Sequence, residues 1–134
     1  MSEGKLHLKV ITPTRVVVDA EVDTVTLPGA LGALGILPGH APLLASLRIG
    51  ELSYRAGNRE HYLAIHMGFA EINADTVTVL ADIAELPAEI DVALARAEKA
   101  VAEEAMKGGT SADLDTSRAG LEGAITRIAV GSRR

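Results

Sequence analysis

Hydrophobic and polar residues alternate along the chain from residue 5 to about residue 86. In the first segment Leu6, Leu8 and Val10 face one way, whereas His7 and Lys9 face the other. A period of two places successive side chains on opposite sides of a β-strand. The alternation therefore predicts strands with one buried face.

Turn-forming residues divide this region into short strand-like segments. β-Branched residues suit a pleated strand, whereas Gly, Asn and Pro suit the corners between strands. The predicted strands after the first are 15–20, 21–27, 33–37, 43–49, 51–55, 60–66, 70–73 and 76–83. Gly57, Asn58 and Asp75 are predicted to form hairpin tips, and Gly68 to separate two strands. Such spacing predicts a β-sandwich of about ten short strands over residues 1–86.

The hydrophobic period changes at Pro87. Over residues 88–106 apolar residues recur at three- and four-residue steps, which predicts an amphipathic helix. Its apolar stripe consists of Ile90, Leu94, Ala97, Val101 and Ala105. Gly108 and Gly109 should end this helix, and Thr110 offers an N-cap to a second one, with Asp113 three positions on. The stripe of the second helix consists of Leu114, Leu121, Ile125 and Ile128.

These two helices predict an antiparallel hairpin over residues 87–134. Its seam is rich in alanine, and Gly120 and Gly123 each cost roughly 1 kcal/mol relative to Ala in a helix interior. Small side chains bury little area, so we expect the hairpin to be held loosely, although alanine equally reflects good helix propensity. The chain is thus predicted to be mainly β plus α, a sandwich followed by a two-helix hairpin.

Composition narrows the classes of function. The net charge of -5 disfavours nucleic-acid binding, which requires a dense basic surface. The chain contains no cysteine and so has no disulfide, thiolate nucleophile or Cys-based zinc site. No apolar run follows the N-terminus and the longest uncharged stretch, 25–47, is broken by Pro and Gly. We therefore expect a soluble chain without a signal peptide or a membrane-inserted segment.

The histidines do not suggest a catalytic centre. His61 and His66 lie on one predicted strand at an odd separation, which places them on opposite faces and disfavours a shared metal. His7 should point to solvent, and His40 lies in a predicted turn. Nothing here resembles a catalytic triad.

The glycines and carboxylates are also better explained as turn formers and surface charges than as parts of a binding or catalytic site. The glycines at 29, 32 and 35 fit an anion-binding loop, but no Gly-Lys-Ser/Thr follows them and strands flank them, which favours turn formers. The carboxylates of Asp82, Glu85, Glu103 and Glu104 are expected to be solvated. The sequence therefore predicts a non-catalytic protein, without catalytic residues or a metal site, that acts by docking onto larger partners.

One segment resembles a known family. The run GALGILPGHAPLL, residues 32–44, is similar to the signature loop of the epsilon subunit of bacterial F-type ATP synthases. Residues 68–72 and 76–82 resemble the closing strands of that family's sandwich, and the hairpin lies where the family has one. The resemblance covers nearly the whole chain. It implies a central-stalk rotor subunit, peripheral to the cytoplasmic face of the bacterial inner membrane.

The resemblance also implies partners. The sandwich would bind the gamma subunit and rest on the c-ring, coupling ion flow to ATP synthesis. A mobile hairpin would rise toward the catalytic beta and alpha subunits and restrain ATP hydrolysis. The loop facing the c-ring and gamma would contain Gly32, Ala33, Leu34, Gly35, Pro38, Gly39, His40 and Pro42. The basic residues available to an acidic segment of beta would be Arg96, Lys99, Lys107, Arg118 and Arg127.

Some members of the family bind ATP on the hairpin through an Ile/Leu-Asp-x-x-Arg-Ala pattern. This chain keeps Ile90 and Asp91 but has Leu94 in place of the arginine, and Arg127 matches one arginine of the second helix. Phosphates without guanidinium partners lose charge-assisted hydrogen bonds. We therefore expect no cofactor, with regulatory ATP binding weak or absent.

Two other hypotheses remain open from the residues alone. One is a free-standing ligand-binding β module whose helical tail forms a dimer. The other is a small hydrolase that uses His40.

Overall fold

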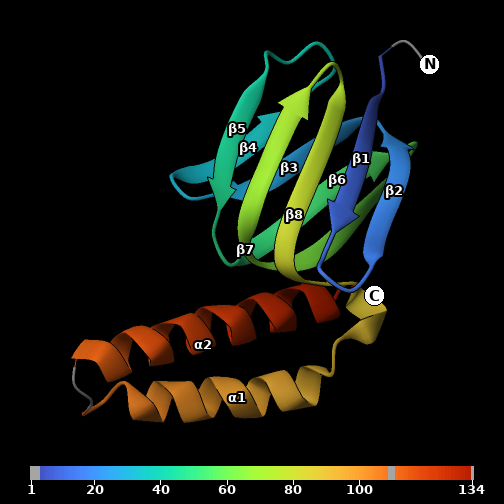
Figure 1. The fold of residues 1–134 in the computed structure, drawn as a ribbon. Helices are drawn as coiled ribbons and strands as arrows, with labels where there is room; N and C mark the ends of the chain where they lie inside the picture. The colour runs from blue at the N-terminus through green and yellow to red at the C-terminus, as the bar shows by residue number, and fades with distance from the viewer. Residues whose placement is uncertain (1–3, 109–110, 134) are drawn as a thin grey trace.

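A computed structural model describes residues 4–108 and 111–133, with side chains from 114 onward in the second range. The described residues form eight strands, a short 3₁₀ helix and two α-helices (Figure 1). The strands are β1 (Leu6–Ile11), β2 (Val16–Val22), β3 (Thr24–Gly29), β4 (Gly32–Ile36), β5 (Leu43–Leu47), β6 (Gly50–Ala56), β7 (Arg59–Asn73) and β8 (Thr76–Glu85). The helices are η1 (Pro87–Glu89), α1 (Val92–Ala105) and α2 (Ser111–Gly131).

The strands form one continuous sheet that folds over into two layers. Its order is β2-β1-β8-β7-β5-β3-β4, and β6 pairs with both β3 and β7. In Figure 1 the front layer holds β5, β7, β8, β1 and β2, and β3, β4 and β6 lie behind it. The β1–β8 pair is parallel and the other pairs are antiparallel. The predicted sandwich followed by a helical hairpin is confirmed.

Strand β7 corrects the predicted number of strands. The segments 60–66 and 70–73 belong to a single strand of 15 residues, and Gly68 lies inside it. Its N-terminal part pairs with β6 in the back layer and its C-terminal part with β5 in the front layer. Gly68 has φ of 147°, and a Cβ there would lie 2.0 Å from the Leu80 carbonyl oxygen. The glycine permits a bend and close packing within one strand. The prediction that Gly68 separates two strands is therefore wrong.

The core between the layers is aliphatic. Its largest fully buried side chains are Leu6, Leu8, Leu27, Ile36, Leu52, Leu63, Ile65 and Ile72, with Val10, Val22, Val25 and Val77. Both predicted hairpin tips are confirmed. Gly57 and Asn58 join β6 to β7, Ala74 and Asp75 join β7 to β8, and Gly57, Ala74 and Asp75 have positive φ as tight hairpin turns require.

The first helix begins later than its sequence pattern predicts. Ile90 has an extended backbone and is 2% exposed, and Asp91 caps α1 by accepting a hydrogen bond from the Leu94 amide at 3.0 Å. Pro87 starts only the short η1, which therefore acts as the link between sandwich and hairpin. The predicted N-cap Thr110 lies outside the described residues.

The predicted apolar stripe of α1 is wrong, and that of α2 is only partly right. The buried residues of α1 are Ala95 and Ala102, whereas Leu94 and Val101 are 57% and 71% exposed. In α2 the buried side chains include Ala124 and Val130, whereas Ile125 is 47% exposed. The helices pack through their smallest residues because small side chains let backbones approach closely. Of the larger apolar residues, Leu94, Val101 and Ile125 are exposed, whereas Leu114, Leu121 and Ile128 are half-buried.

Candidate interaction surfaces

The segment that resembles the family signature is only partly a loop. Residues 32–36 form β4, an edge strand paired with β3, and the chain then turns through 37–42 to reach β5. Gly39 has φ of 83°, and its amide donates to Asp75 Oδ1 at 2.7 Å. The His40 ring donates from Nδ1 to the neighbouring Ala41 carbonyl at 2.8 Å. The bond from Gly39 to Asp75 holds the turn against the β7–β8 hairpin at the end of the sandwich away from the helices (Figure 1).

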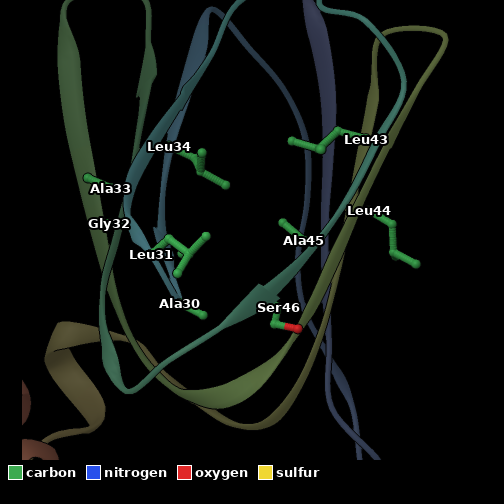
Figure 2. Close-up of a pocket in the computed structure, with 10 residues that line it drawn as sticks. Ala30, Leu31, Gly32, Ala33, Leu34, Leu43, Leu44, Ala45 and Ser46 are labelled. Carbon is green, nitrogen blue, oxygen red and sulfur yellow. The ribbon is translucent and has the colours of Figure 1, made fainter.

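An apolar groove lies between the β3–β4 hairpin and β5. Its volume is about 480 Å³, and it is lined by residues 29–34 and 43–46. Figure 2 shows Leu31 and Leu34 pointing across the groove toward Leu43 and Ala45, with Leu44 pointing away. Leu31 is fully exposed and Leu44 is 73% exposed. Of the residues that the sequence placed on this surface, Gly32, Ala33 and Leu34 line the groove, whereas Gly35, Pro38, Gly39, His40 and Pro42 do not.

A second apolar surface lies on the outside of the front layer, and sequence reasoning missed it. Met67, Phe69 and Leu80, here called the outer-sheet patch, are each about half exposed, and Phe69 pairs directly with Leu80 across β7 and β8. They line a groove of about 650 Å³ that reaches the β1–β2 turn. The chain's single phenylalanine at a solvent-facing strand position is the signal that identifies this surface.

The basic residues of the hairpin separate into two groups. Arg96, Lys107 and Arg118 are exposed and Lys99 is half-buried. Lys107 lies 3.2 Å from Glu104 and Lys99 lies 4.0 Å from Glu103, as ordinary pairs on a helix surface. These four side chains are accessible to a partner.

Arg127 belongs to the contact between hairpin and sandwich. Its Nε donates to Glu85 Oε1 at 2.8 Å, and its Nη1 lies 3.6 Å from Glu98 of α1. His66 Nε2 donates to the same Glu85 oxygen at 3.2 Å. The expectation that Glu85 is solvated is wrong, because its side chain is only 23% exposed. The sequence does not reveal that Glu85 and His66 are partners of Arg127, since only the fold brings β7, β8 and α2 together.

Burial changes the chemistry of His66. Its side chain is 13% exposed. Removal from water lowers its pKa below the ordinary 6.5, the Arg127 guanidinium lowers it further, and the Glu85 carboxylate opposes both effects. The imidazole is therefore neutral at neutral pH.

Further ion pairs bind the sandwich to the start and to the finish of the hairpin segment of the chain. Arg15 of the β1–β2 turn donates two hydrogen bonds to Glu89 of η1, at 2.6 and 2.7 Å. Hydrogen bonding to Arg15, and next to the Leu86 amide, lowers the pKa of Glu89 below its ordinary 4.5. Just after α2, Arg133 donates to Glu51 of β6 at 2.8 Å. Its guanidinium also lies over the Tyr62 ring, 4.0 Å from the ring centre.

The residues matched to the ATP pattern have structural roles here. Ile90 packs with Ala64 and Val130 in a small cluster beneath the hairpin. Asp91 caps α1, and Arg127 binds Glu85. The structure therefore does not bring these three side chains together around a common space.

The other histidines of the described residues make structural contacts. His61 stacks on Tyr54 of β6, with ring centres 4.8 Å apart, and His7 pairs with Asp19 on the neighbouring strand. Within the part of the chain that the structure describes, no three His, Asp or Glu side chains are placed to hold a metal ion. Among the same residues neither helix is long and apolar enough to cross a lipid bilayer.

Comparisons with known proteins agree with this architecture. Residues 5–87 match the family model described as "ATP synthase, Delta/Epsilon chain, beta-sandwich domain". The ATP synthase epsilon chain of Citrifermentans bemidjiense is 44% identical over 131 residues, which cover 96% of this chain and 95% of the relative. The epsilon chain of Geobacter metallireducens is 43% identical over the same shares.

Solved structures share the fold at lower identity. A chain in the cryo-EM structure of the Euglena gracilis mitochondrial ATP synthase, OSCP/F1/c-ring, superposes with a TM-score of 0.84 at 21% identity, covering 94% of this chain and 81% of that one. A chain in the central stalk/c-ring structure of the Tetrahymena thermophila enzyme gives 0.61 at 16% identity, covering 99% and 98%. With the family model and the relatives above, the chain belongs to the family of ATP synthase epsilon chains, which are structural and regulatory subunits rather than catalytic ones.

Proposed function

We propose that this chain is a central-stalk rotor subunit that couples ion flow through the c-ring to ATP synthesis and restrains ATP hydrolysis with its hairpin. Its partners are the gamma subunit, the c-ring and the catalytic beta and alpha subunits. It lies peripherally at the cytoplasmic face of the bacterial inner membrane. It binds no nucleic acid, and ATP binds it weakly or not at all.

The distribution of exposed apolar residues on the sandwich supports two docking surfaces. The groove lined by Leu34 and Leu43 lies largely on the family's signature segment, and we assign it to the c-ring. The outer-sheet patch of Met67, Phe69 and Leu80 is a separate apolar surface, which we assign to gamma. Exposed contiguous apolar side chains on a small domain mark interaction sites, because burying them against a partner is favourable.

The observation that carries the regulatory part is the orientation of the helices. Leu94, Val101 and Ile125 face outward while the hairpin rests on the sandwich through one small apolar cluster around Ile90 and Val130 and through ion pairs. Such a hairpin has apolar surface left to bury elsewhere, and its present contact is weak enough to break. A small energy gap between two packings is what a mobile regulatory element requires.

The test compares assembled ATP synthases that contain different forms of this chain. Deleting residues 88–134 is expected to leave ATP hydrolysis unchanged or raised and coupled ion pumping retained. A full-length double variant, Leu94→Ser with Val101→Ser, should match the deletion in its effect on hydrolysis, because it removes the outward apolar face and spares the contact with the sandwich. Val16→Ser, an exposed apolar change on β2, is the control and should change neither activity.

Two results would contradict the proposal. Failure of the deleted chain to assemble would mean that the hairpin, rather than the sandwich, is the anchor. Recovery of the complex without any contact between residues 5–86 and gamma would remove the proposed role of the sandwich.

A further inference from the structure

Three structural elements converge on one carboxylate beneath the hairpin. Glu85 of β8 accepts hydrogen bonds from His66 of β7 and from Arg127 of α2, both on Oε1. The three side chains are 23%, 13% and 25% exposed, so this is the best-shielded ion-pair cluster at the contact. We call it the Glu85 cluster. It joins sandwich to hairpin directly, since two of its members come from the sandwich and one from α2.

The second nitrogen of the His66 ring has no polar partner in the cluster. Nε2 carries the hydrogen donated to Glu85, so a further proton must go to Nδ1. That atom and Cε1 face Gly123 of α2 so closely that a Cβ on this glycine would lie 3.4 Å from Nδ1 and 3.2 Å from Cε1. A proton on Nδ1 would therefore make the ring positive on the side that faces α2, while its Nε2 shares Glu85 Oε1 with the Arg127 guanidinium. Departure of α2 would remove the Arg127 guanidinium from the protonated ring, whereas Glu85 would stay beside it.

We propose that His66 is a pH-responsive latch whose protonation releases α2, and with it the hairpin, from the sandwich. The proposal deepens the proposed function, because it depends on a hairpin that can leave its present position. It states what the release responds to, namely acidification of the surrounding solution. No other subunit is needed for it.

The direction of the pH dependence follows from the pKa of His66. Burial first, and Arg127 second, lower that pKa in the docked state. An undocked His66 loses the Arg127 charge and part of its burial but keeps Glu85 beside it, so its pKa is higher than in the docked form and it binds more protons. Docking is fully favoured above the undocked pKa. It weakens as pH falls through that pKa and goes on weakening until the lower, docked pKa is reached.

The other charged groups near His66 do not reverse this direction. Glu98 of α1 and Glu85 of β8 favour the protonated ring, but both are weaker influences than burial. Glu51 of β6 is already bound by Arg133. The Arg15–Glu89 pair keeps its charge in the same window, because the pKa of Glu89 lies below 4.5. The link at η1 therefore stays attached while α2 leaves.

The experiment uses the free full-length chain, which has no native cysteine. Spin labels are placed on Arg48→Cys and Lys107→Cys, both exposed positions outside the Glu85 cluster, and their separation is measured by pulsed electron resonance from pH 8 to pH 5. We expect one narrow distance at pH 8 and a longer component that grows as pH falls through the undocked pKa. The docked-to-undocked ratio falls by up to about tenfold for each pH unit between the two pKa values.

Matched histidine variants assign the effect. His66→Gln keeps a donor for Glu85 but cannot ionise, so its distance distribution should not change with pH. His7→Gln, at an exposed histidine on β1, should behave as the unmodified chain does. A pH step that survives in His66→Gln, or an unmodified chain that stays docked down to pH 5, overturns the latch.

A measurement on the unmodified chain covers the case in which the variant does not fold. The His66 ring titrated by NMR should show a midpoint below 6.5, and a midpoint at or above 6.5 contradicts the proposal. Far-ultraviolet circular dichroism should show an intact β signal throughout the titration, and loss of that signal would mean unfolding rather than release. Because no ATPase assay is involved, failure of the latch is distinguishable from failure of the proposed inhibition.

Discussion

Asp91 fits both a nucleotide-binding pattern in the sequence and a helix cap in the structure. Its position in an Ile-Asp-x-x pattern resembles part of an ATP-binding motif, whereas its carboxylate accepts the Leu94 amide at 3.0 Å and caps α1. A helix N-terminus needs such an acceptor because its first amides have no partner within the helix. The residue type is therefore explained by the capping requirement alone.

We predict that Asp91→Ala lowers the free energy of unfolding by about 1 kcal/mol, whereas Asp91→Asn changes it by a few tenths, because Asn caps a helix about as well as Asp. Thermal unfolding of the isolated chain measures both. Calorimetry of the unmodified chain should detect no micromolar ATP binding. Micromolar affinity that Asp91→Asn abolishes would show that the side chain is a ligand to nucleotide after all.

At the scale of elements, the helical hairpin depends on close approach. Gly131, at the end of α2, packs so tightly that a Cβ there would lie 2.5 Å from Val92 Cγ2 and 3.0 Å from Ile90 Cγ2. Gly120 of the same helix is exposed, and a Cβ there would meet nothing within 4 Å. The same residue type thus serves packing at one position and only weakens the helix at the other.

Substituting alanine at these two glycines should therefore have opposite effects. Gly120→Ala is expected to stabilise the chain by about 0.5–1 kcal/mol, because alanine has the higher helix propensity and space is available. Gly131→Ala should destabilise the docked hairpin by roughly 1–3 kcal/mol through overpacking. Hydrogen exchange at the amides of α2 reports the change, and equal protection in both variants would refute this account of the packing.

At the scale of the whole molecule, β7 makes the two layers one unit. It pairs with β6 in one layer, with β5 in the other and with β8 along most of its length. Its bend at Met67 and Gly68 has positive φ at both residues. The outer-sheet patch and the Glu85 cluster both flank this bend, so its geometry positions both surfaces.

Gly68→Ala is predicted to destabilise the whole sandwich by on the order of 3 kcal/mol, because it combines an unfavourable φ with a collision against the Leu80 carbonyl. Gly35→Ala on the edge strand β4 is the control, since a Cβ there would meet nothing within 4 Å. Its effect should stay within about 0.5 kcal/mol. Urea unfolding monitored by circular dichroism compares the two, and similar midpoints would disprove the special role of Gly68.

Local patterns in the sequence were enough to predict the two-part fold. Alternation and turn chemistry indicated the strands and the tips at Gly57 and Asp75, because a half-exposed sheet imposes a period of two on the chain itself. The change of period at Pro87 indicated the hairpin, because a helix with one buried face repeats apolar residues at three- and four-residue steps. The signature run 32–44 indicated the family, and the comparisons confirm it.

Only the tertiary structure decided which faces are buried and which charges meet. The helix stripes were misassigned because hydrophobicity favours Leu94 and Val101, whereas close packing selected Ala95 and Ala102. His66, Glu85 and Arg127 come from positions far apart in the chain, and nothing local marks them as partners. The burial of His66 and the nearby Arg127 guanidinium are properties of the assembled fold. The pKa of His66 could therefore not be inferred from its neighbours in sequence.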